Sequence, residues 1–147
     1  MLPPVEVLVI DDNPGDIALI RESFRECSVQ PRITAAQDAE QAFELLEDPR
    51  REPPALVILD VNLPRTSGLE VLRRIRAEER WNAVPVVIMS SSTMPDEVGR
   101  AYDLHASAYV GKPSNLEAYF EIARGIVTLW LEPLAGAVSR AKQAVLG

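Results

Sequence analysis

The stretch at residues 55–64, ALVILDVNLP, decides the fold of this chain. It opens with an unbroken apolar run, which is followed at once by Asp60 and shortly afterwards by Asn62 and Pro64. A continuous run of Val, Ile and Leu is typical of a strand that is covered on both faces, and such strands occur in parallel sheets between layers of helices. We therefore expect Asp60 at an edge of the sheet, either as a functional group or as an ordinary solvated turn residue.

Apolar runs of this kind alternate with segments of helical periodicity along the chain. They predict strands at residues 5–10, 31–36, 55–59, 85–90 and 106–110. The helices are predicted at residues 14–28, 38–46, 67–79, 93–104 and 114–130. Capping-box patterns begin two of them, Asp38 with Gln41 and Ser67 with Glu70, and Thr93 is the expected N-cap of another. Strict alternation of strand and helix predicts an α/β fold with a doubly wound parallel sheet.

Length and composition restrict the classes of protein that fit. The 147 residues, 47% hydrophobic and 25% charged, suffice for one domain with its own core. The single Cys27 excludes an internal disulfide, and we expect a cytoplasmic location without membrane contact because no signal peptide or membrane-spanning run is recognisable. A net charge of −7 with scattered basic residues argues against nucleic-acid binding. The only histidine is His105, which excludes a histidine-rich metal site.

Polar residues follow directly on the apolar strands: Asp11, Asp12, Asp60, Ser90 and Lys112. The carboxyl ends of parallel strands meet at one edge of the sheet, where α/β proteins bind their ligands. Three carboxylates at one edge repel each other unless a cation neutralises them, and oxygen ligands without His or Cys favour Mg²⁺. The alternative is a set of solvated carboxylates that bind nothing.

A phosphoryl group would fit among these side chains. Lys112 could pair with a carboxylate or with a phosphoryl oxygen, and the Ser90 hydroxyl could donate to another oxygen. A carboxylate nucleophile forms an acyl phosphate, while a metal ion and a lysine absorb charge in the transition state. Asp60 is the best candidate nucleophile, because it ends the most central strand while Asp11 and Asp12 lie side by side as a metal cradle.

These residues and their spacing resemble the receiver domain of two-component response regulators. The resemblance covers residues 5 to about 128 and rests on Asp11-Asp12, on residues 60–64 with Gly68 beyond them, on Ser90, and on Lys112-Pro113. It implies a flavodoxin-like (βα)5 fold with strand order 2-1-3-4-5. It also implies that a phosphohistidine on a sensor histidine kinase phosphorylates Asp60. The chain would then be a phosphoacceptor switch rather than an enzyme, with at most slow self-catalysed phosphorylation and dephosphorylation.

The resemblance further implies roles at the metal ion. Asp12 and the Asp60 carboxylate would bind Mg²⁺ directly. Asn62 would add its backbone carbonyl oxygen as a ligand, and Asp11 would act through water.

On the phosphoryl side, the resemblance implies that Lys112 binds the phosphate, that Ser90 swings toward it, and that Tyr109 turns inward together with Ser90. Ser90 stands where threonine is commoner in the family. The Lys112–Pro113 peptide bond resembles one that is cis in the family, which proline allows at small energetic cost. For Tyr109 the alternative is plain packing of the ring with a solvated hydroxyl.

Residues 1–130 form the predicted receiver domain, and residues 131–147 form a C-terminal helical extension, an amphipathic tail too short for an effector domain. Output through protein contacts is therefore expected. The last long helix carries two apolar stripes, one of Leu116, Phe120, Ala123, Val127 and Trp130 and another of Tyr119, Ile122, Ile126 and Leu129. The second stripe is either a wider buried face or a partner surface, and we favour a homodimer through it.

Two local features make the resemblance strongest to one branch of the family. DNPGD at residues 12–16 and TLWL at residues 128–131 are similar to single-domain receivers that work with bacterial and cyanobacterial phytochrome kinases.

Three other functions fit less well. A phosphatase with an aspartyl nucleophile needs a second Asp where Asn62 stands, an FMN binder needs a loop rich in Ser, Thr and Gly in place of Asp11-Asp12, and a docking module would leave the acidic site inactive.

Overall fold

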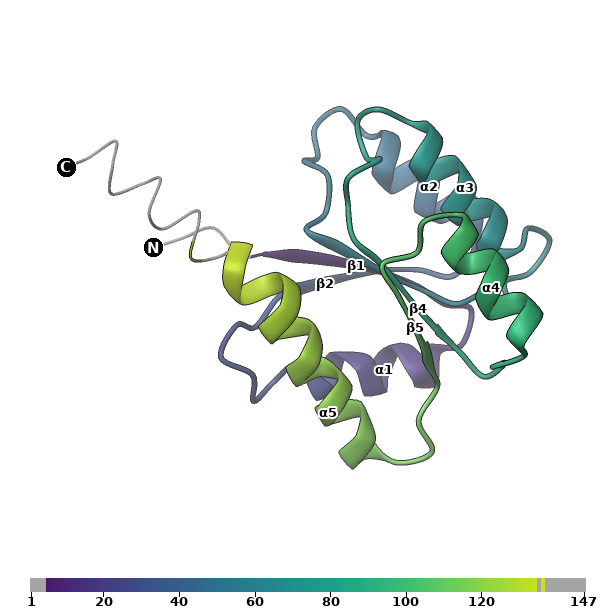
Figure 1. Ribbon diagram of the computed structural model, residues 1–147. Coiled ribbons are helices and arrows are strands. Elements are labelled where there is room, and N and C mark those ends of the chain that lie inside the picture. Colours follow the sequence, from purple (N-terminus) through teal and green to yellow (C-terminus); the bar gives the residue numbers. More distant parts are fainter. Residues whose placement is uncertain (1–4, 135, 137–147) are drawn as a thin grey trace.

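The computed structural model describes residues 5–134 and 136. At its centre lies one parallel sheet of five strands in the order β2-β1-β3-β4-β5 (Figure 1). The strands are β1 (Glu6–Ile10), β2 (Arg32–Ala36), β3 (Leu56–Leu59), β4 (Val86–Ser90) and β5 (Ala108–Gly111). The predicted strand order and the flavodoxin-like topology are confirmed.

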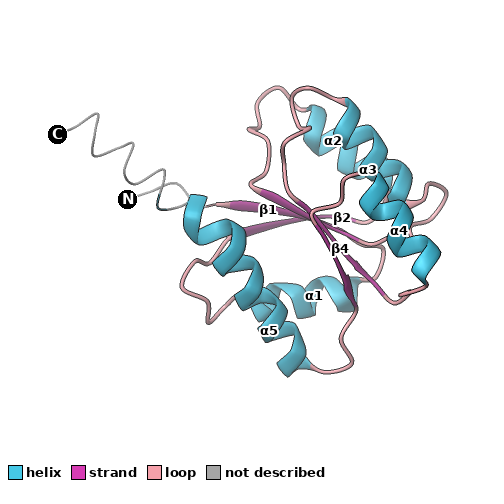
Figure 2. Cartoon of the chain, viewed as in Figure 1, coloured by secondary structure: helices cyan, strands magenta, loops and turns pink. Residues whose placement is uncertain are grey.

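Helices cover both faces of the sheet (Figure 2). They are α1 (Pro14–Ser23), α2 (Ala39–Glu47), α3 (Gly68–Ala77), α4 (Pro95–Asp103) and α5 (Leu116–Ile126), and α5 continues into a π-helical turn, η1 (Val127–Leu131). Helices α1 and α5 pack on one face of the sheet, and α2, α3 and α4 pack on the other. The doubly wound α/β arrangement predicted from the alternation of elements is therefore confirmed.

The central strand β3 is buried on both faces, as its sequence predicts. Val57 and Leu59 pack into the core beneath α2, α3 and α4, whereas Leu56 and Ile58 pack into the core beneath α1 and α5. None of these side chains exposes more than 2% of its surface. Each buried aliphatic side chain contributes about 1.5–3 kcal/mol relative to an exposed one, so a shift of β3 along its neighbours would be strongly unfavourable. The position of Asp60 at the end of β3 is fixed in the same way.

The capping-box predictions hold in part. Asp38 caps α2 by accepting a hydrogen bond from the Gln41 N–H at 2.8 Å, and the Gln41 side chain accepts from the N–H of Gln37 rather than from that of Asp38. Ser67 caps α3, but the Glu70 carboxylate pairs with a neighbouring arginine of the helix instead of returning to Ser67. An ion pair with an arginine one turn along the helix replaces the second half of the predicted box.

The predicted N-cap Thr93 is wrong. Helix α4 begins at Pro95, with Met94 in the N-cap position and without a side-chain capping bond. Proline is favoured at the first helical position because its fixed φ suits the helix and its missing N–H is not needed there. Helix α1 ends at Ser23, earlier than predicted, and Leu19 on its outer side is 36% exposed.

Helix α5 buries side chains from both predicted apolar stripes. Tyr119, Ala123 and Ile126 follow regular helical spacing on the side that faces the sheet. The π-helical turn η1 then holds more residues than an α-helical turn and rotates the residues that follow it, so Leu131 rather than Trp130 is fully buried.

The predicted separate partner face at Tyr119, Ile122, Ile126 and Leu129 is wrong for two of these residues. Tyr119 and Ile126 expose only 3% each, because both pack into the chain's own core, and Ile122 is half-buried against that core. Leu129 is 66% exposed. The helix continues through Leu134, beyond the predicted end of the receiver domain. The remainder of the predicted amphipathic tail lies outside the described residues.

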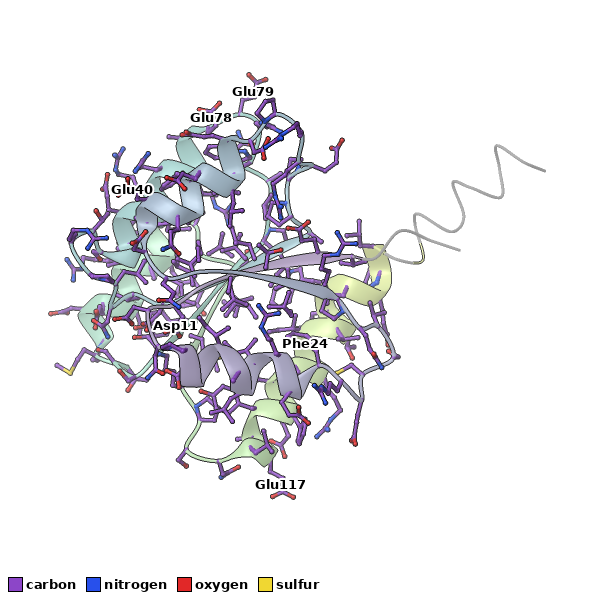
Figure 3. The ribbon with its side chains drawn as sticks, turned by 180° about the vertical axis from the view of Figure 1, so that it is seen from behind. Asp11, Phe24, Glu40, Glu78, Glu79 and Glu117 are labelled. Carbon is purple, nitrogen blue, oxygen red and sulfur yellow. The ribbon has the colours of Figure 1, made fainter. Side chains whose placement is uncertain are left out.

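Acidic side chains project from several sides of the molecule. Figure 3 shows Glu40, Glu78, Glu79 and Glu117 pointing away from the body of the protein.

Across the part of the chain that the structure describes, none of the helices has the length and apolar character needed to cross a bilayer.

Candidate functional site

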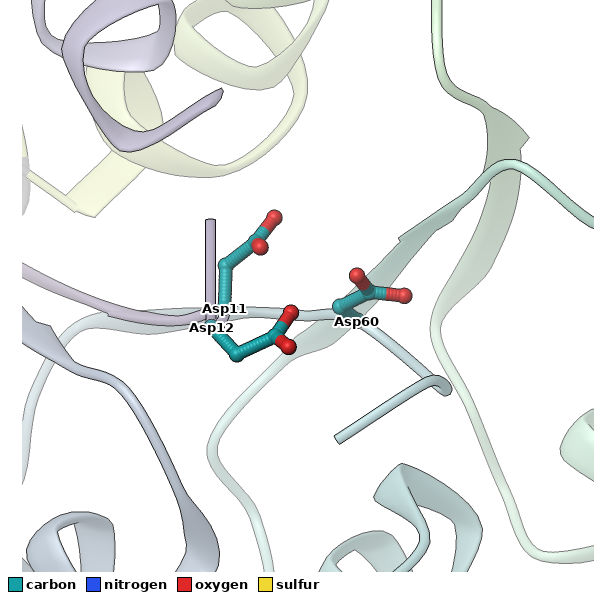
Figure 4. Close-up of side chains that lie close together, drawn as sticks. All are labelled: Asp11, Asp12 and Asp60. Carbon is teal, nitrogen blue, oxygen red and sulfur yellow. The ribbon is translucent and has the colours of Figure 1, made fainter. Parts of the chain in front are cut away.

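The acidic residues predicted at the strand ends lie together at one edge of the sheet (Figure 4). Asp11 and Asp12 follow β1, and Asp60 follows the neighbouring strand β3. Backbone hydrogen bonds continue past the strand ends: the Asp11 N–H donates to the Ala36 carbonyl at 3.0 Å, and the Asp60 N–H donates to the Ile10 carbonyl at 2.9 Å. The sheet itself therefore positions Asp11 and Asp60.

Local hydrogen bonds also orient the two buried carboxylates. Oδ1 of Asp11 accepts from the Asn13 N–H at 2.9 Å, and Oδ1 of Asp60 accepts from the Asn62 N–H at 3.0 Å. Aspartate side chains commonly bond the backbone two residues further on in this way. In both residues the other oxygen, Oδ2, faces Lys112.

Gly68 lets α3 begin directly behind Asp60. Its N–H donates to the Val61 carbonyl at 2.8 Å. A Cβ atom at this position would lie 2.1 Å from the Asp60 carbonyl oxygen and 2.7 Å from the Val61 Cα. Because both obstacles are backbone atoms, residue 68 must be glycine for the turn after β3 to keep this shape.

The three carboxylates form an acidic group that suits a divalent cation. One oxygen each from Asp11, Asp12 and Asp60 can be chosen so that all three lie within 4.8 Å of one another. Asp11 and Asp60 are buried and Asp12 is exposed, so the group is open to solvent on one side. Burial raises the pKa of Asp11, while the Asn13 N–H and the Lys112 ammonium act in the opposite direction. Donors that are all oxygen fit hard ions such as Mg²⁺ or Mn²⁺.

Lys112 supplies positive charge next to this acidic group. Its Nζ lies 2.8 Å from Asp60 Oδ2 and 3.1 Å from Asp11 Oδ2. Burial lowers the pKa of Lys112, but hydrogen bonds to three carboxylates outweigh that effect and hold the pKa above its ordinary value. Lys112 is therefore charged, and it follows β5 at the same edge of the sheet as Asp60, as the sequence predicts.

The third carboxylate on Lys112 belongs to Asp16, which is not among the site residues predicted from the sequence. Asp16 Oδ2 lies 2.7 Å from Lys112 Nζ, closer than either other carboxylate. Asp16 stands in the first turn of α1, after the N-cap Asn13. The position of Asp16 in the sequence indicates that it could join the site, because the first turn of a helix that begins at a strand end faces the same edge of the sheet. Acidic residues are so common in the first turn of helices that this signal alone has little weight.

Ser90 and Tyr109 lie on the strands beside the acidic group. Ser90 is fully buried at the end of β4, where its hydroxyl accepts from the Ser92 N–H at 3.2 Å and its carbonyl accepts from the Lys112 N–H at 2.8 Å. The Tyr109 hydroxyl donates to the Ser92 carbonyl at 2.6 Å, so it joins β5 to the loop between β4 and α4. Burial raises the pKa of Tyr109, and the carboxylates of Glu97 and Asp60 add to that effect. Tyr109 is half-buried and its hydroxyl has a partner, unlike the solvated tyrosine of the alternative interpretation.

The cis form of the Lys112–Pro113 peptide bond, implied by the resemblance, is not present. The bond is trans, which is the more stable isomer for most bonds that precede proline.

A family model of the response regulator receiver domain matches residues 7–124. The chain is 31% identical over 137 residues to the response regulator Rcp1 of Synechocystis sp., covering 88% of this chain and 91% of that protein. It is 34% identical to the probable methanogenesis regulatory protein FilR2 of Methanothrix harundinacea, covering 87% of this chain and 84% of that protein. The chain therefore belongs to the receiver-domain family of two-component response regulators.

Solved structures support the same family, and one of them is the structure of a phytochrome response regulator. The crystal structure of the phosphorylated cyanobacterial phytochrome response regulator RcpA matches with a TM-score of 0.81 at 32% identity, covering 88% of this chain and 95% of that chain. The Mn²⁺-bound form of Rcp1 matches with a TM-score of 0.79 at 31% identity, covering 88% of this chain and 96% of that chain. The predicted resemblance to phytochrome-associated receivers is confirmed.

Proposed function

We propose that this receiver domain accepts a phosphoryl group on Asp60 from a phosphohistidine of a sensor histidine kinase. The observation that carries this proposal is the contact between Lys112 Nζ and Asp60 Oδ2 at 2.8 Å, beside two further carboxylates that suit a divalent ion. A buried carboxylate next to a fixed positive charge and a metal position is the arrangement that an acyl phosphate requires.

The transfer reaction balances with the groups at this edge. A carboxylate oxygen of Asp60 attacks phosphorus, an O–P bond forms, and the N–P bond of the phosphohistidine breaks. The electron pair of that bond stays on the imidazole nitrogen, which takes a proton from solvent. Lys112 can donate to the phosphoryl oxygens, since its ammonium group already points at Asp60. Ser90, at the end of β4, has the hydroxyl that we assign to another phosphoryl oxygen.

Mg²⁺ is the cation that we assign to the acidic group. Asp12 and Asp60 would bind it directly, with the Asn62 carbonyl as a further ligand and Asp11 acting through water. When bound, the ion neutralises charge on the phosphoryl group and on the carboxylates. The similar protein Rcp1 has been solved in a Mn²⁺-bound form, which supports a divalent cation as the metal bound by this chain.

The kinase that we assign as partner belongs to the phytochrome class. The support is the similarity to RcpA, which is a phytochrome response regulator, over 88% of this chain. FilR2, a probable methanogenesis regulator with similar coverage, shows that the same receiver architecture also occurs in other pathways. Phosphoryl transfer from a phytochrome kinase at least about tenfold faster than from an unrelated histidine kinase is the expected result, and the reverse preference would contradict this assignment.

A hydrolytic function is less well supported. The position two residues after Asp60 is held by Asn62, whose N–H donates to Asp60 Oδ1 and whose amide side chain cannot serve as a general acid. We therefore assign Asp60 as an acceptor of phosphate rather than as the nucleophile of a turnover enzyme.

The output that we propose is a protein contact, with a homodimer through the last helix as the specific hypothesis. The support is Leu129, which leaves 66% of its surface exposed while Val127 and Leu131 of the same turn are buried in the core. Exposed large apolar side chains often mark contact surfaces when other apolar groups lie near them. Sedimentation velocity should show a dimer that Leu129→Glu converts to a monomer; a monomeric wild-type protein at high concentration would contradict the hypothesis.

The proposed function is tested by intact-mass measurement after incubation with Mg²⁺ and a small acyl phosphate. We expect one phosphoryl addition to the wild-type protein that hydroxylamine removes. The addition should be absent with Asp60→Asn and absent when a chelator replaces Mg²⁺. A hydroxylamine-labile phosphoryl group on Asp60→Asn would contradict the assignment of the acceptor.

A further inference from the structure

Lys112 makes a contact that neither the metal position nor the phosphoryl acceptor explains. Its closest carboxylate is that of Asp16, at 2.7 Å, compared with 2.8 Å for Asp60 and 3.1 Å for Asp11. A lysine ammonium group has three N–H donors, so these three carboxylates occupy its full capacity. The Lys112 side chain is only 14% exposed, which leaves little room for water to replace a lost partner.

The three carboxylates differ in what the proposed function requires of them. Asp60 receives the phosphoryl group, and Asp11 belongs to the acidic group that suits a cation. Asp16 is not a member of that group. It is therefore the one carboxylate on Lys112 that neither the proposed cation nor the proposed phosphoryl group would engage.

Asp16 is itself held in place by the start of α1. Its N–H donates to the Asn13 side chain at 3.3 Å, in the capping arrangement of that helix. A carboxylate in the first turn of a helix is also favoured by the helix dipole. On the other side it faces Tyr119 of α5, whose pKa is raised first by burial and then by the charge of Asp16. The carboxylate therefore has a defined position between α1, α5 and Lys112.

We propose that Asp16 is a positioning residue that holds the Lys112 ammonium group beside Asp60. The proposal rests on the proposed function in its consequence for phosphoryl transfer, but the contact itself is independent of that function. A lysine side chain has a flexible four-carbon stem and strong hydration, so a fixed partner is needed to keep one donor aimed at the acceptor. With Asp16 as that partner, Lys112 can exchange Asp60 for a phosphoryl oxygen without leaving the site.

The position of Lys112 can be observed without phosphorylation. The sequence contains two lysines, Lys112 and Lys142, so a ¹H–¹⁵N correlation spectrum of the side-chain ammonium groups is simple, and Lys142→Arg assigns it. In Mg²⁺-saturated protein we expect a Lys112 signal that exchanges slowly with water. Asp16→Asn, which keeps an acceptor oxygen, should retain the signal, and Asp16→Ala should increase the exchange rate by at least about tenfold. Asp96→Ala is the matched control, because Asp96 stands in the first turn of α4, and it should leave the signal unchanged.

Phosphorylation rates with a small acyl phosphate test the consequence. We expect Asp16→Ala to slow phosphorylation by about tenfold, Asp16→Asn to restore most of the rate, and Asp16→Ala to have no further effect when Lys112 is already alanine. Circular dichroism confirms that each variant is folded. An unchanged Lys112 exchange rate in Asp16→Ala would overturn the proposal, and so would an equal slowing of phosphorylation in the presence and absence of Lys112. If the wild-type protein accepts no phosphate, the proposed function fails and the ammonium spectra alone decide the role of Asp16.

Discussion

Replacement of Gly68 by alanine is predicted to damage both the stability and the site of this receiver domain. The added Cβ would lie 2.1 Å from the Asp60 carbonyl oxygen, 2.7 Å from the Val61 Cα and 2.9 Å from the Asp60 carbonyl carbon. Favourable contacts between carbon atoms begin at about 3.5 Å, so the start of α3 would have to move away from β3 by about 1 Å. The hydrogen bond from the Gly68 N–H to the Val61 carbonyl would be stretched by the same movement.

The expected loss of stability follows from these two effects. Overpacking of a rigid site costs about 1–3 kcal/mol, and a weakened backbone hydrogen bond adds about 1 kcal/mol. The sum of about 2–4 kcal/mol corresponds to a fall of roughly 10 °C in the melting temperature of a domain of this size. Urea unfolding monitored by circular dichroism measures the loss directly. Phosphorylation of Asp60 should slow as well, because the clash moves the backbone of the acceptor residue itself.

Gly99→Ala is the matched control for this experiment. Gly99 lies inside α4, and a Cβ there would have no neighbour within 4 Å. Alanine in a helix is more stable than glycine by about 0.5–1 kcal/mol, so this variant should be slightly more stable than the wild type. If Gly68→Ala unfolded at the same urea concentration as the wild type, the close approach of α3 to Asp60 would be refuted.

Three further predictions concern the side chains of the site. The raised pKa of Asp11 means that its contribution to stability is fully present below the unfolded pKa of about 3.8 and is lost as the pH rises through the folded value. Protonation of Asp11 competes with Mg²⁺, so the same Mg²⁺ concentration should stabilise the protein less at pH 4 than at pH 7. At pH 7, Mg²⁺ at ten times its dissociation constant should add about 1.4 kcal/mol to the unfolding free energy. Thermal melts of the wild type and of Asp11→Asn at both pH values test this dependence. Lys112→Ala removes a positive charge 2.8 Å from Asp60 and should tighten Mg²⁺ binding by about tenfold in calorimetry, whereas weaker binding would show that Lys112 does not compete with the ion. Tyr109→Phe removes the 2.6 Å bond to the Ser92 carbonyl and should lower the unfolding free energy by about 1 kcal/mol, with an unchanged urea midpoint as the contrary result.

The strands and the edge that carries the site could be predicted because strong local patterns coincide with the fold. The apolar run before Asp60 has no polar residue to place on an outer face, and its short length and its Val, Leu and Ile content favour a strand buried on both sides. The same reasoning applies to the strand before Ser90 and to residues 7–10 of the strand before Asp11, which begins with the partly exposed Glu6. Because parallel strands end at one edge, the joint position of these polar residues followed from the topology alone.

The partner of Lys112 on α1 could not be predicted in this way. Asp16 contacts Lys112 across 96 positions of sequence, and only the packing of α1 beside the end of β5 brings the two together. An acidic residue in the first turn of a helix satisfies the local helix chemistry without any such contact. Nothing in the local pattern distinguishes an acidic residue that contacts a distant lysine from one that only stabilises the start of its own helix.

The prediction of a separate partner face on α5 is wrong for a related reason. The apolar residues of α5 are numerous enough for two stripes, and spacing alone does not say which one faces the sheet. Regular α-helical spacing placed Trp130 on a buried stripe, whereas the π-helical turn brings Leu131 there instead. A π turn has no recognisable sequence signal in this stretch, so the register of the last helix had to come from the structure.

The most direct test of the central claim is to trap the acyl phosphate on its residue. Protein incubated with Mg²⁺ and a small acyl phosphate is reduced with borohydride, which converts a phosphorylated aspartate to homoserine, and the peptides are then sequenced by mass spectrometry. The account predicts homoserine at position 60 in the presence of Mg²⁺ and none after chelation. Homoserine at position 11, 12 or 16 in place of position 60 would contradict it.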